Sequence, residues 1–492
     1  MNPFLVISII SGYFLLLVVI SVLTTKKVNS ETFFTANRQS PWYLVAFGMI
    51  GASLSGVTFI SVPGWVASTQ FSYMQVVLGY LVGYFVIGTV LLPLYYRLNL
   101  TSIYEYLESR FGFWSYKTGG FYFLLSRTIG AAFRLFIVSR VLQLAVFDAW
   151  GVPFSVTVVV TIALIWLYTF RGGIKTIVWT DTLQTLFMLS AVGVVIYIIN
   201  KELDFSFSEM YTAVSESKYS KVFHWDWQPG TNFFKQFFSG AFIAIVMTGL
   251  DQDMMQKNLT CKNIGEAQKN MFWFSIVLVF VNLIFLTLGA LLYIYSSTKG
   301  IPLPESSDDL LATLSLNHFE LIAGVLFLLG IVAAAYSSAD SALTSLTTSF
   351  CVDFLSFKKE ETVAIQKQQT MTRLLVHLGF SLILVIVILI FQRVNDEAII
   401  SSVFKAAGYT YGPLLGLYAF GLFTKLRVID HLVPIVCLAS PVISFILNVY
   451  SKQILFGYEF GFEILIVNGL LTFFGLAIIQ KKAASYESDQ FV

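Results

Sequence analysis

Charged residues are scarce in this chain: Asp, Glu, Lys and Arg together make up 12% of its 492 residues. Soluble domains contain about 25% charged residues, so the deficit excludes an ordinary water-soluble protein. Hydrophobic residues reach 57% and the mean hydropathy is +0.78, which is typical of an integral membrane protein. The formal net charge is only +2, and no basic block of the kind that binds nucleic acid is present.

Cysteine and histidine are also rare. The three cysteines and four histidines are spread along the chain, and none of them has the close spacing of zinc or redox motifs. We interpret the cysteines as small buried hydrophobic residues. The sequence therefore predicts no transition-metal cluster.

Long apolar runs are abundant, and thirteen of them are long enough to cross a bilayer. Their approximate bounds are 3–24, 42–69, 75–97, 118–147, 153–171, 176–200, 232–259, 265–297, 317–352, 369–393, 407–424, 430–450 and 459–480. The first run lacks the basic start and the cleavage site of a signal peptide, so we expect it to remain as a helix. We predict an all-α protein with about 13 transmembrane helices.

Basic residues favour one orientation of these helices. An odd number of spans places the two termini on opposite sides of the membrane. With the N-terminus outside, 19 of the 30 Lys and Arg residues fall in cytoplasmic segments and 8 in outer segments. Because cytoplasmic loops carry an excess of Lys and Arg, we expect an outer N-terminus and a cytoplasmic C-terminus in the plasma (inner) membrane.

The ninth apolar run carries an unusual stripe of polar residues in its middle. Ser337, Asp340, Ser341 and Thr344 recur at helical spacing and so lie on one face. An ionisable group at membrane depth is costly and is a functional-site hypothesis by default. Hydroxyl and carboxylate oxygens are the ligands that small hard cations prefer. We therefore expect an ion site on this helix.

Two apolar runs, five helices apart, are interrupted by small or polar residues. The second run contains Gly51, Ala52, Ser53, Ser55, Gly56 and Pro63, and the seventh contains Ser239, Gly240, Thr248, Gly249 and Asp251. One interpretation is close helix packing through small residues. The other is a pair of broken helices, which is the best sequence indication of an inverted-repeat transporter with its binding sites at the breaks.

Asp181, in the sixth run, is a second carboxylate inside the membrane. It is either a rim aspartate that pairs with Lys175 or a buried anion for a second cation or a proton. Asp181 and Asp340 together would also suit an intramembrane aspartyl protease. Neither follows a Gly-x-Gly sequence, and the surrounding hydroxyls favour ion binding.

Three arginines, Arg127, Arg134 and Arg140, share one side of the fourth run. Arg134 is the deepest of the three. It either meets an anionic substrate or forms a structural ion pair with Asp148 or another acid.

An ordered set of motifs in this chain resembles the sodium:solute symporter family. They are Gly172-Gly173 followed by Trp179-Thr180-Asp181, the run Asp251-Gln252-Asp253-Met254-Met255-Gln256-Lys257, Ala334 with Ser337-Ser338, and Gly412-Pro413 with Gly421-Leu422-Phe423-Thr424-Lys425. The resemblance implies a leucine-transporter-like core of five plus five inverted helices, with one helix before and two after. The expected parts are 1–41 (first helix and loop), 42–200 (first repeat), 201–231 (outer loop), 232–426 (second repeat) and 427–492 (last two helices and tail).

The resemblance also implies residues for sodium, the expected coupling ion. The sodium site that family members share would use Gly51, Leu54, Ala334, Ser337 and Ser338. A second sodium site, present in some members, would use Asp181, Ser337, Asp340 and Ser341. The sialic acid carriers of the family have serine where this chain has Asp340.

For the solute, the resemblance points to Ser53, Ser55 and Thr58, which are similar to hydroxyl positions around a carboxylate in the sialic acid carriers. The further candidates are Tyr73, Gln75, Arg134 and Met247. Met247-Thr248 replaces the Tyr-Trp pair of the sugar cotransporters, which argues against a stacked neutral hexose. We expect a sodium-coupled importer of a small carboxylated solute such as a sugar acid, and not an enzyme. We also expect the protein to work as a monomer in the bilayer. A carrier of a neutral sugar, amino acid or vitamin, and a passive channel, remain as alternatives.

Overall fold

The computed structural model describes residues 3–24, 39–98, 100, 102–169, 174–357, 363–394 and 398–481. The Gly172-Gly173 motif and the polar tail after residue 481 lie outside these residues. Within the described part, the regular structure is helical apart from two isolated β-bridges, Ser40 with Cys261 and Val428 with Gln480. The prediction of an all-α protein is confirmed for this part of the chain.

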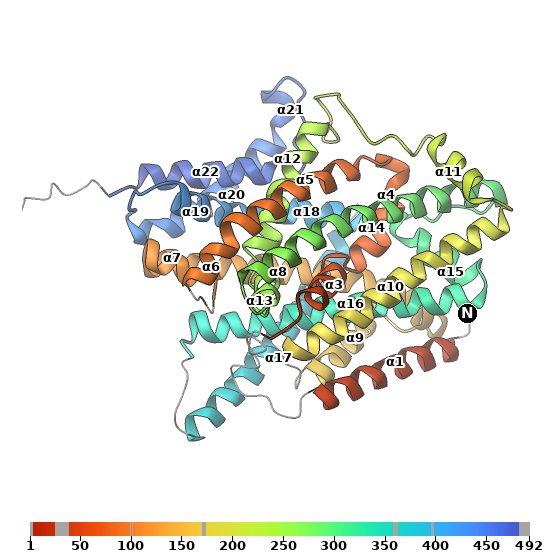
Figure 1. The fold of residues 1–492 in the computed structure, drawn as a ribbon, viewed down its shortest axis with the longest axis horizontal. Helices are drawn as coiled ribbons and strands as arrows, with labels where there is room; N and C mark the ends of the chain where they lie inside the picture. The colour runs from red at the N-terminus through yellow and green to blue at the C-terminus, as the bar shows by residue number, and fades with distance from the viewer. Residues whose placement is uncertain are drawn as a thin grey trace, which may run out of the picture.

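The helices follow the order of the predicted apolar runs (Figure 1). Those in the membrane-sized segments are α1 (Pro3–Thr24), α3 (Trp42–Ser53), α4 (Gly56–Thr69), α5 (Tyr73–Val86), α6 (Leu92–Leu98), α8 (Phe113–Leu142), α9 (Phe154–Thr169), α10 (Ile174–Glu202), α12 (Phe233–Ala244), α13 (Gln252–Asn258), α14 (Ile264–Lys299), α16 (Leu321–Ser349), α17 (Val363–Val394), α18 (Ile399–Thr410), α19 (Gly412–Phe423), α20 (Val433–Val449) and α22 (Ile464–Ile478). The shorter helices α7 (Glu105–Arg110), α11 (Phe207–Ser215), α15 (Leu310–Asn317) and α21 (Ser451–Ile454) lie between them. Single π-helical turns continue α5, α8, α12 and α16, at Ile87–Leu91, Gln143–Phe147, Ile245–Gly249 and Phe350–Phe354.

Length and apolar composition qualify seven helices of the described part as membrane spans, or nine if each bent pair is one span. Four shorter apolar helices, within α1, α9, α19 and α22, coincide with the remaining predicted runs. The protein is thus a multi-pass helical membrane protein, and the count of 13 spans stays a prediction.

Both helices predicted to be interrupted are broken. The axis turns by 54° between α3 and α4, and by 73° between the end of the α12 segment and α13. Helix α10 packs along α16 and α3, and α12 packs along α5. Leu54 and Ser55 at the first break, and Leu250 and Asp251 at the second, are buried, so both breaks lie inside the bundle.

The loops define two ends of the bundle. At the predicted cytoplasmic end, the backbone amide of Ser40 donates to Thr260 O at 3.1 Å. The Asp430 carboxylate accepts the amides of Trp114 and Ser115 there at 2.8 and 2.9 Å. At the opposite end, the amide of Phe71 donates to the carbonyl of Lys221 in the long loop that was expected at 201–231.

The eleventh apolar run begins earlier than predicted. We expected a start near residue 407, whereas α18 begins at Ile399 and meets α19 at Tyr411. The carboxylate of Asp308, in the segment between α14 and α16, accepts the backbone amide of Ile399 at 3.0 Å. The first amides of a helix need hydrogen-bond partners. The partner of the Ile399 amide comes from far away in the sequence, so the local pattern did not reveal where α18 begins.

Candidate functional site

The break between α3 and α4 opens the backbone in the middle of the bundle. Leu54 (φ −81°, ψ 60°) and Ser55 (φ −61°, ψ 170°) leave helical geometry. The amide of Leu54 still donates to Ile50 O, but the carbonyls that follow, Gly51 included, lie past the last helical hydrogen bond. The Ser55 side chain does not cap α4. Main-chain oxygens and the hydroxyl are therefore available to a ligand.

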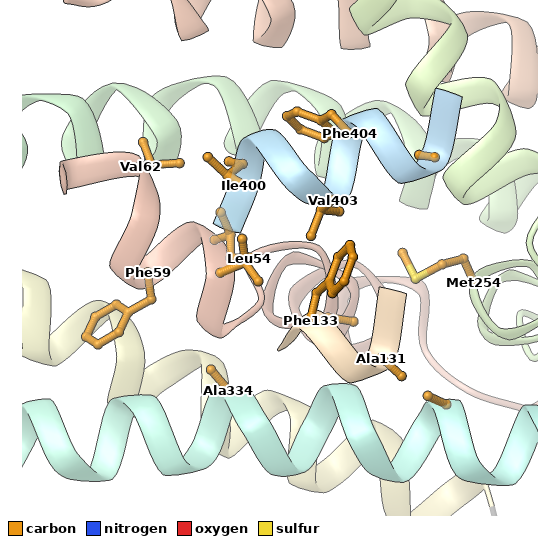
Figure 2. Close-up of a cluster of buried hydrophobic side chains, with 14 of the residues drawn as sticks. Leu54, Phe59, Val62, Ala131, Phe133, Met254, Ala334, Ile400, Val403 and Phe404 are labelled. Atoms are coloured by element: carbon orange, nitrogen blue, oxygen red, sulfur yellow. The ribbon is translucent and has the colours of Figure 1, made fainter. Parts of the chain in front are cut away.

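Helix α16 places its polar stripe beside this break. Ala334, Ser337, Ser338, Asp340 and Ser341 are all buried. Figure 2 shows Leu54 at the break between α18 above it and Ala334 on α16 below it. The Ser338 hydroxyl is buried and has no hydrogen-bond partner among the described residues. The structure thus brings the two segments of the expected sodium site together.

Gly51 lies where α3 meets α10. A Cβ atom at this position would come within 2.0 Å of Thr185 Oγ1 and 3.3 Å of the Asp181 carbonyl oxygen. Only glycine therefore allows α3 to approach α10 so closely. This contact brings the break in α3–α4 next to the segment of α10 that carries Asp181.

Asp181 is engaged on both carboxylate oxygens. Lys257 Nζ lies 3.0 Å from Asp181 Oδ2, and the Ser337 hydroxyl donates to Oδ1. The side chains of Asp181 and Lys257 are 1% and 2% exposed. Asp181 is therefore a deeply buried member of an ion pair with Lys257.

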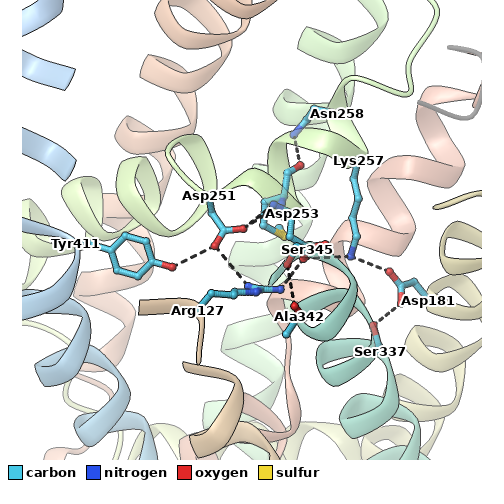
Figure 3. A network of polar contacts seen from close by, with 11 residues as sticks. Arg127, Asp181, Asp251, Asp253, Lys257, Asn258, Ser337, Ala342, Ser345 and Tyr411 are labelled. Carbon is cyan, nitrogen blue, oxygen red and sulfur yellow. Dashed lines mark hydrogen bonds and ion pairs between the residues drawn. The ribbon is translucent and has the colours of Figure 1, made fainter. Parts of the chain in front are cut away.

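The pair continues into a buried polar network at the second break (Figure 3). Arg127 lies 2.6 Å from the Asp253 carboxylate and 3.6 Å from that of Asp251. The Tyr411 hydroxyl donates to Asp251 at 3.1 Å, and Asp251 caps α13 by accepting the amides of its second and third residues. The charges of the motif at 251–257, which also suited an ordinary charged helix end, thus lie inside the protein.

A small cavity of about 90 Å³ lies beside the first break. Six of the seven predicted substrate residues line it, namely Ser53, Ser55, Thr58, Tyr73, Arg134 and Met247. Val403 and Phe404 of α18, both labelled in Figure 2, line its opposite wall.

The three arginines of α8 have different surroundings. Arg127 pairs with Asp251 and Asp253, while Arg140 Nη2 lies 2.6 Å from the Asp309 carboxylate. Arg134 lies between them and lines the cavity. No ion pair or hydrogen bond of its guanidinium is found within the described part of the chain. Arg127 lines the cavity as well, but its guanidinium is paired with Asp253 and Asp251. Arg134 is therefore the cavity arginine of this helix that a ligand can pair with.

Gln75, the seventh predicted substrate residue, does not line the cavity. Its amide nitrogen donates to Thr231 O at 2.9 Å and to Gln236 Oε1 at 2.8 Å, and its oxygen accepts the amide of His224. The side chain joins α5 to α12 and to the outer loop.

Two residues at the site, Asn282 and Lys257, were not among the predicted site residues. Asn282 of α14 lines the cavity and is 2% exposed. Its nitrogen donates to Leu278 O, and its oxygen has no partner among the described residues. Lys257 is the second. A lone amide in the apolar run Val277–Phe285 was a usable signal for Asn282, whereas Lys257 gave none, because a lysine at a helix end usually faces water.

Comparison with known proteins identifies the family of the chain. The model of the sodium:solute symporter family matches residues 33–428. The sodium/sialic acid symporter SiaT of Proteus mirabilis is 25% identical over 431 residues, which cover 85% of this chain and 84% of that protein. The sodium/sialic acid symporter NanT of Aliivibrio fischeri is 26% identical over 411 residues, 81% and 79% of the two chains.

Among solved structures, a Na⁺-coupled sialic acid symporter in a substrate-bound outward-open state superposes with a TM-score of 0.80. The sequences are 19% identical, and the match covers 96% of this chain and 97% of the other. The likeness establishes a shared fold. With a family match over most of its length, the chain belongs to the sodium:solute symporter family, and sodium is its coupling ion.

Proposed function

We propose that this protein imports a carboxylated sugar, of the sialic acid type, together with sodium. The observation that carries this proposal is Arg134, whose guanidinium lines the cavity with no acidic partner among the described residues. Arg134 is partly exposed at the cavity, and a cation that has no ion pair there favours a negatively charged ligand. The two sialic acid symporters among its relatives support the same class of solute.

The break in α3–α4 supplies the other half of the recognition. Ser53, Ser55 and Thr58 carry hydroxyls at the cavity. Helix α4 begins there without a side-chain cap, and the first amides of a helix favour an anion through hydrogen bonds and the helix dipole. A carboxylate would thus lie between the start of α4 and Arg134.

For sodium, we propose the site formed by the carbonyls of Gly51, Leu54 and Ala334 with the hydroxyls of Ser337 and Ser338. The unpartnered, buried hydroxyl of Ser338 supports this assignment. Sodium here would hold the broken helix against α16. Coupling requires that sodium binds the outward-facing state more tightly than the inward-facing one, because only a difference in affinity shifts the equilibrium.

The architecture that we propose is the five-plus-five inverted repeat, with residues 42–200 and 232–426 as its halves and 13 spans in all. The two broken helices stand at matching places in these halves, as expected of such a repeat. We also propose an outer N-terminus, a cytoplasmic C-terminus and a monomer in the plasma membrane.

The rival functions make different demands on the cavity. A neutral sugar, amino acid or vitamin would leave Arg134 without a full negative charge from the solute. A passive channel would equilibrate the solute and not accumulate it.

Ligand-dependent stability of the purified protein tests the proposal, because a ligand that binds the folded state raises its apparent stability. We expect sialic acid, in sodium, to raise the melting temperature, and a neutral N-acetylated hexosamine to have no effect. Arg134→Gln should weaken sialic acid binding about tenfold to a hundredfold, since hydrogen bonds to charged groups contribute about 1.5–3 kcal/mol.

Arg140→Gln is the matched control, because Arg140 is on the same helix but pairs with Asp309 away from the cavity. It should leave sialic acid affinity unchanged. Equal affinity of Arg134→Gln and the unmodified protein would overturn the assignment of Arg134. Stabilisation by the neutral sugar alone would overturn the solute class.

A further inference from the structure

The ammonium of Lys257 occupies the place where a cation would neutralise Asp181. It lies 3.0 Å from Asp181 Oδ2, within the range of a charge-assisted hydrogen bond. The Ser337 hydroxyl donates to the other oxygen. Both carboxylate oxygens of Asp181 thus have donors, and its charge has a counter-ion that belongs to the chain.

We propose that the ammonium of Lys257 takes the place of a second sodium ion at Asp181. The protein would then bind a single sodium ion, at the site formed by the first break and α16. The inference rests on sodium coupling and not on the identity of the solute. A second cation beside Asp181 would have to displace the ammonium or lie close to it, and two like charges at such a distance repel strongly in a buried site. The ammonium is part of the chain, so it cannot dissociate from the protein as a bound sodium ion can.

The position of Lys257 gives the pair a mechanical role as well. Lys257 lies on α13, the half-helix beyond the 73° break, and Asp181 lies on α10. The same Ser337 that donates to Asp181 is a proposed sodium ligand on α16. A continuous chain of contacts therefore runs from the sodium site through Asp181 to the second broken helix. Movement of α13 would change the orientation of the Ser337 hydroxyl and so the affinity for sodium.

Lys257 is a positioning residue in this account, and the number of bound sodium ions is the readout that a merely structural lysine would not change. The purified full-length protein would be titrated with radioactive sodium in choline buffer, without any organic solute. We expect one sodium ion per chain. Lys257→Gln leaves Asp181 as a buried anion beside the hydroxyls of α16, and we expect it to bind two.

Three further variants complete the test. Lys257→Arg keeps the positive charge and should bind one sodium ion. Adding Asp181→Asn to Lys257→Gln removes the carboxylate that Lys257 contacts at 3.0 Å and should return the count to one. Lys235→Gln is the matched control: Lys235 is also buried on the same broken helix, but it donates to the carbonyls of Gln228 and Glu459 at the opposite end. This variant should bind one sodium ion.

Two sodium ions bound by the unmodified protein would overturn the proposal, whether or not Lys257→Gln folds. A count that stays at one in folded Lys257→Gln would overturn it as well. Because no solute is present, a wrong assignment of the transported acid would not alter either result.

Discussion

The guanidinium of Arg127 lies 2.6 Å from the carboxylate of Asp253, and both side chains are buried where the α12 segment bends into α13. The pair joins α8 of the first half to the broken helix of the second half. Its surroundings hold a second acid, Asp251, at 3.6 Å from the same arginine. The bend is thus fixed by charge pairing between helices that are far apart in the sequence.

Arg127→Gln should strongly destabilise the protein. Removing one partner of a buried ion pair costs about 3–5 kcal/mol, because the other charge stays buried without compensation. We expect a large fall in the melting temperature in detergent. Arg140→Gln should lower it far less, because the Arg140 side chain is 37% exposed and its pair with Asp309 is screened by water. Equal melting temperatures for the two variants would contradict this role of Arg127.

Replacing both serines of the proposed sodium site, Ser337→Ala with Ser338→Ala, should abolish sodium-dependent uptake. The double change removes two hydroxyl ligands and leaves the volume of the helix face nearly unchanged. Ser345→Ala is a control two turns further along α16, where the hydroxyl donates to Ala342 O of its own helix. If uptake by the double variant still depended on sodium with the same apparent sodium affinity as the unmodified protein, the two hydroxyls would be ruled out as ligands.

Asn282→Leu should weaken binding of a hydroxylated acid while an aliphatic monocarboxylate binds as before. The unpartnered amide oxygen at the cavity can accept a hydrogen bond from a sugar hydroxyl. Loss of one such bond corresponds to about a threefold to tenfold loss of affinity. Leu278→Met, on the same wall one turn earlier, should affect both acids little. Equal losses for the two acids in Asn282→Leu would show that the amide contributes only to packing.

Asp308 should make stability depend on pH. Burial raises the pKa of this carboxyl above its ordinary value, although the amide of Ile399 and the nearby Arg140 favour the charged form. The ionised group therefore costs folding free energy, and protonation relieves this cost. Stability should fall as pH rises from about 3.9, the ordinary pKa of aspartate, through the raised pKa of the folded state.

Melting temperatures of the unmodified protein and of Asp308→Asn across this pH range would measure the effect. The variant should lose the Asp308 part of the pH dependence, whereas Asp309→Asn should keep it. Identical pH profiles for Asp308→Asn and the unmodified protein would show that Asp308 does not cause the pH dependence of stability.

Much of the fold was predictable because lipid imposes a simple rule. Apolar runs of sufficient length must form helices in a bilayer, and the runs at 42–69 and 232–259 were marked as broken by their small and polar residues. The start of α18 at Ile399 was not predictable, because its first amide is satisfied by Asp308 from another part of the chain. Local periodicity carries no information about such a partner.

Part of the candidate site was also predictable from the sequence. The hydroxyl stripe of α16 and the polar residues of the first break stand out against apolar neighbours, and the structure brings them together. Lys257 could not be assigned, because burial of a lysine beside Asp181 depends on how α13 bends into the bundle. Gln75, in contrast, was predicted to bind the solute because it is a polar residue on α5. Its side chain instead bonds to α12 and to a loop and does not face the cavity.

Uptake into proteoliposomes would show whether the protein couples the entry of a sugar acid to sodium. Purified protein would be reconstituted with choline inside and sodium outside, and the entry of radiolabelled sialic acid would be followed over time. We expect transient accumulation above the external concentration. It should collapse when a sodium ionophore dissipates the gradient, and it should be absent in Arg134→Gln. Entry that only equilibrates, with or without the sodium gradient, would contradict this coupling.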